Sequence, residues 1–185
     1  MIRLRDVEFS YPKANENHAF SLEVPSLEVS RGESLAVVGA SGSGKTTLLE
    51  LIAGILPASR GEVEVCGERL DRMSDAERRR FRRRHVGLVF QSFELVEYLD
   101  AFENILLPLR LEPGRTIDRA AREHARELAA TIGLEARLTH RPRALSQGER
   151  QRVAICRALI ASPSLILADE PTSSLDRGRA TEAVD

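Results

Sequence analysis

The sequence predicts an α/β fold: a parallel sheet at the core, an antiparallel β subdomain before it and a helical subdomain beside it. An apolar run at residues 34–38 leads into a glycine-rich loop and then a helical segment, which is the order strand, loop, helix. Apolar and polar residues alternate through the first thirty positions, as in antiparallel strands. Helical periodicity covers much of the stretch from residue 101 to residue 161. These patterns together indicate a sheet with helices packed on it.

The expected strands are short apolar or alternating segments bounded by turn residues. They lie at residues 2–9, 20–24, 27–29, 34–38, 61–67, 86–90 and 165–168. The expected helices lie at residues 46–53, from 74, at 101–133, at 146–161 and from 177. Gly54 should stop the first helix, and Ser74 with Glu77 forms a capping box that opens the second. Pro108 and residues 112–114 should break the third.

Length and composition restrict the class of protein. The chain has 185 residues, enough for one domain, and 42% apolar residues, enough for a core. A net charge of −1 argues against a protein that binds nucleic acid through bulk charge, so no nucleic-acid partner is expected. No apolar run approaches the length of a membrane span, so we expect any role at a membrane to be exercised from the cytosolic side through a partner.

An arginine-rich run at residues 78–85 allows two interpretations. It could bind nucleic acid or a membrane surface, or it could be the solvated face of a helix. Acidic residues lie nearby at Asp71, Asp75 and Glu77, and the chain as a whole is not basic. We therefore favour the solvated face.

Residues 39–46 fit the phosphate-binding pattern G-x-x-x-x-G-K-[ST] at every fixed position. The glycines allow backbone N–H groups to turn toward phosphate oxygens, and the N-terminus of the following helix adds its positive end. In this pattern Lys45 reaches the β and γ phosphates and Thr46 holds Mg²⁺. A glycine-rich turn before an ordinary helix is the alternative, and the complete match disfavours it.

Two carboxylates end the apolar strand expected at residues 165–168. Ligands of open α/β sheets lie beyond the carboxyl ends of the strands, which places Asp169 where it could reach Mg²⁺ beside Thr46. Glu170 could orient and polarise an attacking water. Taken alone, an apolar strand followed by Asp-Glu is a weak signal. A phosphate-binding loop in the same chain makes it a strong one.

Ser146 and Glu149 form a capping box at the start of another helix, where unpaired N–H groups and the Ser146 hydroxyl make an anion site. With the other motifs, this segment resembles the nucleotide-binding subunits of ATP-binding cassette (ABC) transporters, and the resemblance covers the whole chain. Tyr11 is similar to the family's adenine-stacking aromatic. The remaining matches follow in the family's order: the Walker A loop at 39–46, the glutamine Gln91 after a V-F-Q strand, the signature motif at 145–152, Walker B at 165–170 and the D-loop at 174–176.

The resemblance implies a P-loop NTPase fold, ATP hydrolysis, and ATP and Mg²⁺ as cofactors. It assigns catalysis to Glu170 and Gln91, and Mg²⁺ to Thr46, Gln91 and Asp169. It assigns nucleotide binding to Tyr11, Gly39, Ser41, Gly42, Ser43, Gly44, Lys45, Thr46, Thr47, Ser146 and Gly148. Ser146 and Gly148 would serve the site of a second ATPase subunit in a head-to-tail dimer.

The chain departs from the family pattern in two places. The common signature reads L-S-G-G-Q, and here Gln147 and Glu149 replace its first glycine and its glutamine. Ser146 and Gly148 remain, so we expect function to survive. The family also has a switch histidine beyond Walker B, a position that the chain does not reach, and none of its histidines stands there: His18, His85, His124 and His140. We therefore expect residues 1–185 to be an ABC ATPase domain that is incomplete at its C-terminal end, with a mostly helical subdomain at 92–145.

Residues 93–99 and 103–109 resemble the lipoprotein-releasing, macrolide-exporting and cell-division class of the family. That resemblance implies an integral membrane permease as partner and a cytoplasmic location, peripheral on the inner face of the cell membrane. One alternative is a soluble ABC ATPase of DNA repair or of ribosomes, but the zinc modules, coiled coils or second cassette typical of these are not visible. Another is a regulator that binds nucleotide without hydrolysing it, which Glu170 argues against.

Overall fold

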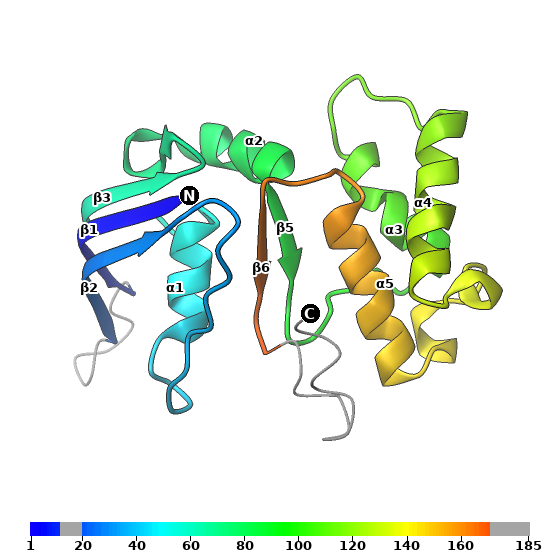
Figure 1. Ribbon diagram of the computed structural model, residues 1–185, viewed down its shortest axis with the longest axis horizontal. Helices are drawn as coiled ribbons and strands as arrows, with labels where there is room; N and C mark the ends of the chain where they lie inside the picture. The colour runs from blue at the N-terminus through cyan, green and yellow to red at the C-terminus, as the bar shows by residue number, and fades with distance from the viewer. Residues whose placement is uncertain (12–19, 171–185) are drawn as a thin grey trace. The chain divides into compact units, whose positions relative to one another are not determined.

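The computed structural model describes residues 1–11 and 20–170 and divides the chain into two compact units, Met1–His85 and Val86–Asp185 (Figure 1). Each unit has its own sheet and its own helices. The D-loop candidate at residues 174–176 and the helix expected from residue 177 lie outside the described residues.

An antiparallel sheet of four strands, in the order β2-β1-β3-β4, forms the first unit. Its strands are β1 (Ile2–Ser10), β2 (Ser21–Val29), β3 (Arg60–Val65) and β4 (Glu68–Arg69). Ile2 pairs with Val29 on one side and with Val65 on the other, so β1 is central and β2 lies at an edge. An edge strand tolerates the missing N–H of Pro25, and residues 21–29 therefore form one strand where the sequence predicted two. The predicted antiparallel strands are confirmed.

Alternation along these strands buries one set of side chains. Ile2, Leu4, Val63 and Val65 are buried, and helix α1 (Lys45–Ile52) packs against β3 through its own buried residues. Each buried aliphatic side chain contributes roughly 1.5–3 kcal/mol relative to an exposed one. This burial holds α1, and with it the phosphate-binding loop, on the sheet.

Helix α2 (Asp75–His85) follows the short helix η1 (Leu70–Arg72) and begins as predicted. The Ser74 amide donates to the Glu77 carboxylate at 2.7 Å, and the Glu77 amide donates to the Ser74 hydroxyl at 3.4 Å. Phe81 is buried, whereas four arginines of this helix are exposed: Arg79, Arg80, Arg83 and Arg84. The helix thus presents an arginine-rich solvated face, which agrees with the interpretation favoured from the sequence.

The strand predicted at residues 34–38 is absent. These residues form no helix or strand, and Leu35, Val37 and Val38 are 51%, 43% and 92% exposed. A strand is stabilised by hydrogen bonds to a neighbouring strand, and within the described residues 34–38 have no such neighbour. The apolar composition predicts a buried strand, but these residues are exposed and have no neighbouring strand among the described residues, because composition alone does not supply a pairing partner.

Two parallel strands form the sheet of the second unit. Strand β5 (Val86–Val89) pairs with β6 (Leu165–Ala168), and the register joins Val86 to Leu165 and Val89 to Ala168. Both strands were predicted. Their burial is partial, however, because Leu167 is buried while Ile166 is 44% exposed. The described sheet has only these two strands, so each has one side without a partner in that part of the chain.

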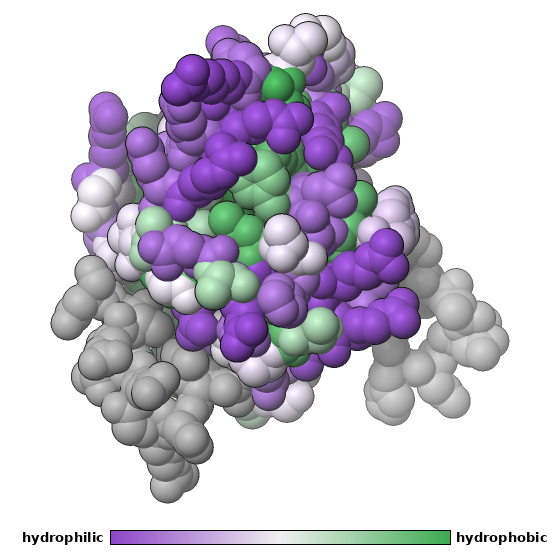
Figure 2. All heavy atoms as spheres, turned by 90° about the vertical axis from the view of Figure 1, so that its right-hand side faces the viewer, coloured by the Kyte–Doolittle hydropathy of each residue, from purple (hydrophilic) through white to green (hydrophobic). Residues whose placement is uncertain are grey.

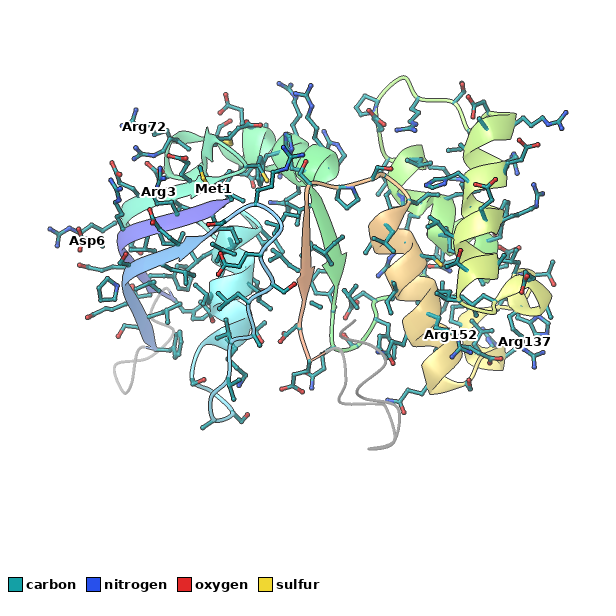
Figure 3. All side chains as sticks on the ribbon, in the orientation of Figure 1. Met1, Arg3, Asp6, Arg72, Arg137 and Arg152 are labelled. Carbon is teal, nitrogen blue, oxygen red and sulfur yellow. The ribbon has the colours of Figure 1, made fainter. Side chains whose placement is uncertain are left out.

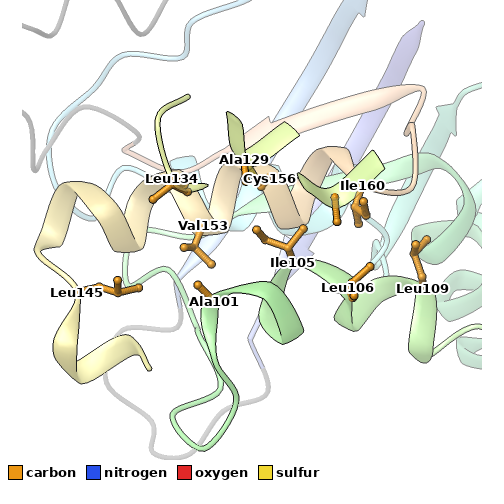
Figure 4. Packing of buried hydrophobic residues seen from close by; sticks show 11 residues of the cluster. Ala101, Ile105, Leu106, Leu109, Ala129, Leu134, Leu145, Val153, Cys156 and Ile160 are labelled. Carbon is orange, nitrogen blue, oxygen red and sulfur yellow. The ribbon is translucent and has the colours of Figure 1, made fainter. Parts of the chain in front are cut away.

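Three helices pack together beside this sheet: α3 (Ala101–Arg110), α4 (Arg119–Thr131) and α5 (Gln147–Leu159). Figure 4 shows their shared core, in which Ile105 and Leu109 of α3 and Ala129 of α4 meet Val153 and Cys156 of α5. A second face of α5 carries Ala154 and Ala158, which pack with Val89 and Phe93. Helix α5 is therefore buried on two sides, and its direction is fixed by both clusters.

Pro108 does not break α3, contrary to the prediction. The helix continues to Arg110, and the Leu111 amide still donates to the Leu107 carbonyl at 3.1 Å. A proline inside a helix costs about 3 kcal/mol. Burial of Ile105, Leu106 and Leu109 offsets that cost, because each contributes roughly 1.5–3 kcal/mol.

The helical subdomain proposed at residues 92–145 holds α3, α4 and the short helices η2 (Glu135–Arg137) and η3 (Pro142–Ala144). Its core is shared with α5, which lies beyond residue 145. On the face that carries α4, hydrophilic side chains predominate, with hydrophobic atoms visible between them (Figure 2). In the described part of the chain every helix is too short or too polar to cross a bilayer.

Candidate functional site

The phosphate-binding loop leads directly into α1. Gly44 is the residue before the helix and has a φ of +94°. A side chain at this position would be strained by that φ, and a Cβ would lie 2.9 Å from the Phe20 ring. The Ser43 amide donates to the Ala40 carbonyl at 3.2 Å, which closes the turn ahead of the helix. Ser41 and Gly42 lie within this turn, and the helix N-terminus at Lys45 and Thr46 follows it, as the phosphate-binding pattern requires.

Lys45 folds back over the loop. Its ammonium donates to the carbonyls of Gly39 and Ala40, each at 2.9 Å. Two neutral carbonyls do not neutralise this cation, and a phosphate oxygen would be a stronger, charge-assisted acceptor. The loop thus holds the Lys45 ammonium in place, and this positive charge can attract a phosphate group.

Tyr11 lies beside the start of α1. Its hydroxyl is 3.3 Å from the Thr47 hydroxyl, and its ring contacts Phe9 edge-on and Phe20. The side chain remains 42% exposed. The structure therefore brings the aromatic candidate to the phosphate-binding loop and leaves part of the ring accessible for stacking on a base.

The carboxyl ends of β5 and β6 carry the other predicted polar groups. The Gln91 amide donates to the Glu170 carboxylate at 2.7 Å, although the two residues are far apart in the sequence. The Asp169 amide donates to the Val89 carbonyl at 2.9 Å and extends the parallel ladder by one residue. Parallel pairing places both strand ends at one edge of the sheet, and so Gln91, Asp169 and Glu170 gather there.

Glu170 has a left-handed backbone, with a φ of +47°. A residue other than glycine in this region costs of order 1–2 kcal/mol. Strain of this kind persists where the surrounding structure holds it, and here the hydrogen bond from Gln91 fixes the side chain. The turn after β6 thereby directs the Glu170 carboxylate toward the end of β5.

Ser146 caps α5 in the predicted capping box. Its hydroxyl accepts from the Glu149 amide at 3.3 Å, and its own amide donates to the Glu149 carboxylate at 2.7 Å. The second carboxylate oxygen accepts from Arg137 of η2 at 2.7 Å. Arg137 and Arg152 are labelled in Figure 3 near this end of the helix. Both oxygens of Glu149 are therefore used within the chain, and its replacement of the family's glutamine adds an ion pair.

Gly148 has no structural requirement to be glycine. Its φ is not left-handed, and an added Cβ would meet only the end of the Arg152 side chain, at 3.7 Å. Nothing in the fold around this position therefore requires glycine, and the absence of a side chain leaves the backbone at the start of α5 accessible.

A pH-dependent stability follows from the Glu149 contacts. The Ser146 amide and the Arg137 guanidinium lower the pKa of Glu149 from 4.5 to about 2. A carboxyl whose pKa falls on folding stabilises the folded state above its unfolded pKa. Glu149→Gln keeps the cap and loses the ion pair, so it should unfold at lower urea concentration at pH 7. The difference in urea midpoint between Glu149→Gln and the unaltered protein should disappear as the pH falls from 4.5 to 2, because the carboxylate then becomes protonated in both the folded and the unfolded state.

Glu123→Gln serves as the matched control, because Glu123 pairs with Arg119 on the exposed surface of α4. Its unfolding midpoint should stay close to that of the unaltered protein at both pH values. If the difference in urea midpoint between Glu149→Gln and the unaltered protein is the same at pH 7 and at pH 2, this carboxylate contributes nothing to stability through its charge.

Two structural residues near this site were missed in the sequence. Asn104 is fully buried in α3, and its amide accepts from the Val96 amide and donates to the carbonyls of Val96 and Leu99. Arg157 of α5 donates to the carbonyls of Phe93 and Glu94. A single amide in an apolar helical run signals a buried hydrogen-bonding role and could have identified Asn104. Arg157 follows an ordinary helical pattern and gives no such signal.

The predicted residues fall into two groups. Tyr11, the loop from Gly39 to Gly44, Lys45, Thr46 and Thr47 lie in the first unit. Gln91, Ser146, Gly148, Asp169 and Glu170 lie in the second. A family model described as ABC transporter matches residues 22–173, which include most of both groups. The chain belongs to the ABC transporter family. Its resemblance to this family is thereby confirmed.

Curated relatives in the ABC family point to one branch. The lipoprotein-releasing system ATP-binding protein LolD of Chromohalobacter salexigens is 49% identical over 159 residues, which cover 86% of this chain and 66% of that protein. LolD of Alcanivorax borkumensis is 44% identical over 173 residues, which cover 92% of this chain and 75% of that protein. The chain thus spans about two thirds to three quarters of the length of these relatives.

A solved ABC structure shows the same fold. The dimeric, post-hydrolysis state of the ATP-binding cassette MJ0796, bound to ADP and Pi, matches with a TM-score of 0.89 and 34% identity. The match covers 98% of this chain and 79% of that one. The predicted α/β cassette fold, with its antiparallel N-terminal sheet, parallel sheet and helices, is confirmed.

Proposed function

We propose that the chain binds and hydrolyses ATP as the nucleotide-binding subunit of an ABC transporter. The observation that carries this proposal is the meeting of Gln91 and Glu170 at the carboxyl ends of β5 and β6. A carboxylate and an amide at one strand edge can hold a water between them and a phosphate, and the carboxylate can polarise it. The Lys45 loop supplies the phosphate-binding half of the same chemistry.

Each candidate residue has a defined task in this proposal. Tyr11 stacks on adenine, and the amides of the loop with Lys45 hold the phosphates. The loop members in contact with nucleotide are Gly39, Ser41, Gly42, Ser43, Gly44, Lys45, Thr46 and Thr47. Glu170 accepts the proton of the attacking water, and Gln91 orients that water.

Thr46, Gln91 and Asp169 fit a Mg²⁺ ion by their chemistry, because hydroxyl, amide and carboxylate oxygens are hard ligands. In residues 1–11 and 20–170, no cluster of three His, Cys, Asp or Glu side chains could hold a metal unaided. Mg²⁺ at nucleotide sites is usually bound by one or two protein groups together with phosphate oxygens, and we propose that arrangement here. The bound ion would neutralise charge that develops on the phosphates during hydrolysis.

Two copies are proposed to act together, head to tail. Ser146 and Gly148 would then bind the γ-phosphate held by the Walker A loop of the other copy. The exposed cap at Ser146 and the unneeded glycine at 148 support this, since both leave the start of α5 open to an anion. The matched cassette MJ0796 is described as a dimer.

The transported substrate class and the membrane partner follow from the relatives. Both LolD relatives are named for a lipoprotein-releasing system. We therefore propose an integral membrane permease as partner, a place on the cytoplasmic face of the membrane, and lipoproteins as the substrates that the complex moves. ATPase activity that rises when the permease is added would support this part of the proposal.

Lys45→Ala tests the phosphate-binding half. Loss of a charge-assisted hydrogen bond costs about 1.5–3 kcal/mol, so ATP affinity should fall about tenfold or more. Calorimetric titration of ATP measures it. Arg60→Ala is the control, because its side chain is 75% exposed and pairs only with Glu8 among the described ion pairs. Unchanged ATP affinity in Lys45→Ala would exclude the loop as the phosphate site.

A further inference from the structure

Arg157 holds the backbone of Phe93 and Glu94, two residues in the segment that follows Gln91, by hydrogen bonds. One terminal nitrogen of its guanidinium donates to the Glu94 carbonyl at 2.6 Å, and the other donates to the Phe93 carbonyl at 2.5 Å. The side chain is half-buried. A planar fork that meets two successive carbonyls fixes both the position and the direction of that backbone.

The backbone of Phe93 and Glu94 is strained. Phe93 and Glu94 have φ values of +61° and +46°, so two successive residues other than glycine are left-handed. Such a pair persists only where its surroundings hold it. Several contacts hold it: the Phe93 ring packs with Val89, Ala154 and Ala158, and the Phe93 amide donates to the Phe90 carbonyl at 3.0 Å. The Ser92 hydroxyl donates to the Glu94 carboxylate, and the Arg157 fork is the contact that ties this backbone to α5 by hydrogen bonds.

The far end of the segment is held separately. Asn104 accepts from the Val96 amide at 2.8 Å and donates to the Leu99 carbonyl at 3.2 Å. Asn104 therefore fixes residues 96–99 to α3, whereas Arg157 fixes residues 93 and 94, which are next to Gln91, to α5. Leu95 lies between these two attached parts.

Ser146 caps helix α5, and Arg157 lies on that helix about three turns after the cap. We propose that Arg157 is a positioning residue, which holds Gln91 in a fixed place relative to the helix that Ser146 caps. The inference rests on the proposed function for its kinetic consequence, because Gln91 is assigned there to the ATP of its own chain and Ser146 to the ATP of the other copy.

Amide hydrogen exchange tests the attachment without nucleotide. In the full-length protein, Arg157→Met should speed exchange of peptides covering residues 91–95 by about tenfold or more, because a strained loop has lost one anchor. Arg157→Lys, which keeps the charge and loses the fork, should give an intermediate increase. Exchange of α4 should be unchanged, which shows that the unit still folds. Arg119→Met is the matched control, since Arg119 is 90% exposed and pairs with Glu123.

Kinetics test the positioning. Arg157→Met should lower kcat for Mg-ATP about tenfold and leave KM nearly unchanged, because the Lys45 loop is intact. Gln91→Ala should lower kcat as well. If Arg157 acts through Gln91, the double variant should be no slower than Gln91→Ala alone. A purely structural role would lower kcat in both backgrounds by the same factor.

The proposal is overturned if exchange at 91–95 is unchanged in Arg157→Met, or if the two kinetic effects multiply. Failure of the proposed function looks different: the unaltered full-length protein would then show no ATP turnover at all. In that case the exchange result still decides whether Arg157 holds the loop.

Discussion

Glu170→Gln in the full-length protein is expected to stop ATP hydrolysis while ATP remains bound. A positioned general base contributes about 10²–10⁴-fold to a rate, and the amide cannot accept the proton of the attacking water. The substitution should not disturb the fold, because a glutamine can still accept the hydrogen bond that Gln91 donates at 2.7 Å. ATP-bound dimers should therefore accumulate, since the step that opens them is lost.

Two measurements on purified protein check this result. Release of phosphate from Mg-ATP gives the rate, and light scattering with ATP gives the fraction of dimer. Glu127→Gln is the control, because Glu127 lies on α4 with its side chain 77% exposed. It should hydrolyse ATP at the unaltered rate. Hydrolysis by Glu170→Gln at that same rate would remove Glu170 from the catalytic role.

Local sequence signals predicted much of the candidate site. The phosphate-binding pattern requires glycine where the backbone turns, and Gly44 is left-handed as that pattern demands. The capping box of Ser146 and Glu149 involves residues only three apart, so its hydrogen bonds follow from the sequence directly. Helix starts and loop chemistry are predictable because their physical causes lie within a few residues.

Features that depend on distant partners were not predictable. Residues 34–38 have the composition of a buried strand, yet a strand needs a neighbour that no local pattern provides. Proline ordinarily breaks a helix, yet α3 continues through Pro108, because the packing of α3 on α5 outweighs the free-energy cost of the proline. In both cases tertiary contacts, present or absent, decide the outcome against local preference.

The link between Arg157 and the segment after Gln91 shows the same limit. The donor and its acceptors are more than sixty residues apart in the sequence. The left-handed φ values at Phe93 and Glu94 carry no sequence signature either, because neither residue is glycine. Only the folded unit shows that one side chain holds this strained backbone.

Ser146→Arg in the full-length protein is expected to abolish dimer formation and ATPase activity, and to leave ATP binding by the monomer nearly normal. Loss of the cap costs about 1 kcal/mol, and a cation at a helix N-terminus adds about 0.3–1 kcal/mol. Burial of α5 on two sides is larger than both, so the unit should stay folded. What the substitution removes is the open anion site at the start of α5, which the proposed dimer needs for the γ-phosphate of the other copy.

Ser74→Arg is the matched control, because Ser74 forms the same kind of capping box with Glu77 at the start of α2. Both variants lose one cap, so their unfolding midpoints should fall by similar amounts. Only Ser146→Arg should lose the ATP-dependent dimer in light scattering and the release of phosphate. ATP affinity of the monomer distinguishes the two possible arrangements. If it falls sharply in Ser146→Arg, the Ser146 site binds the nucleotide of its own chain, and the head-to-tail arrangement is wrong.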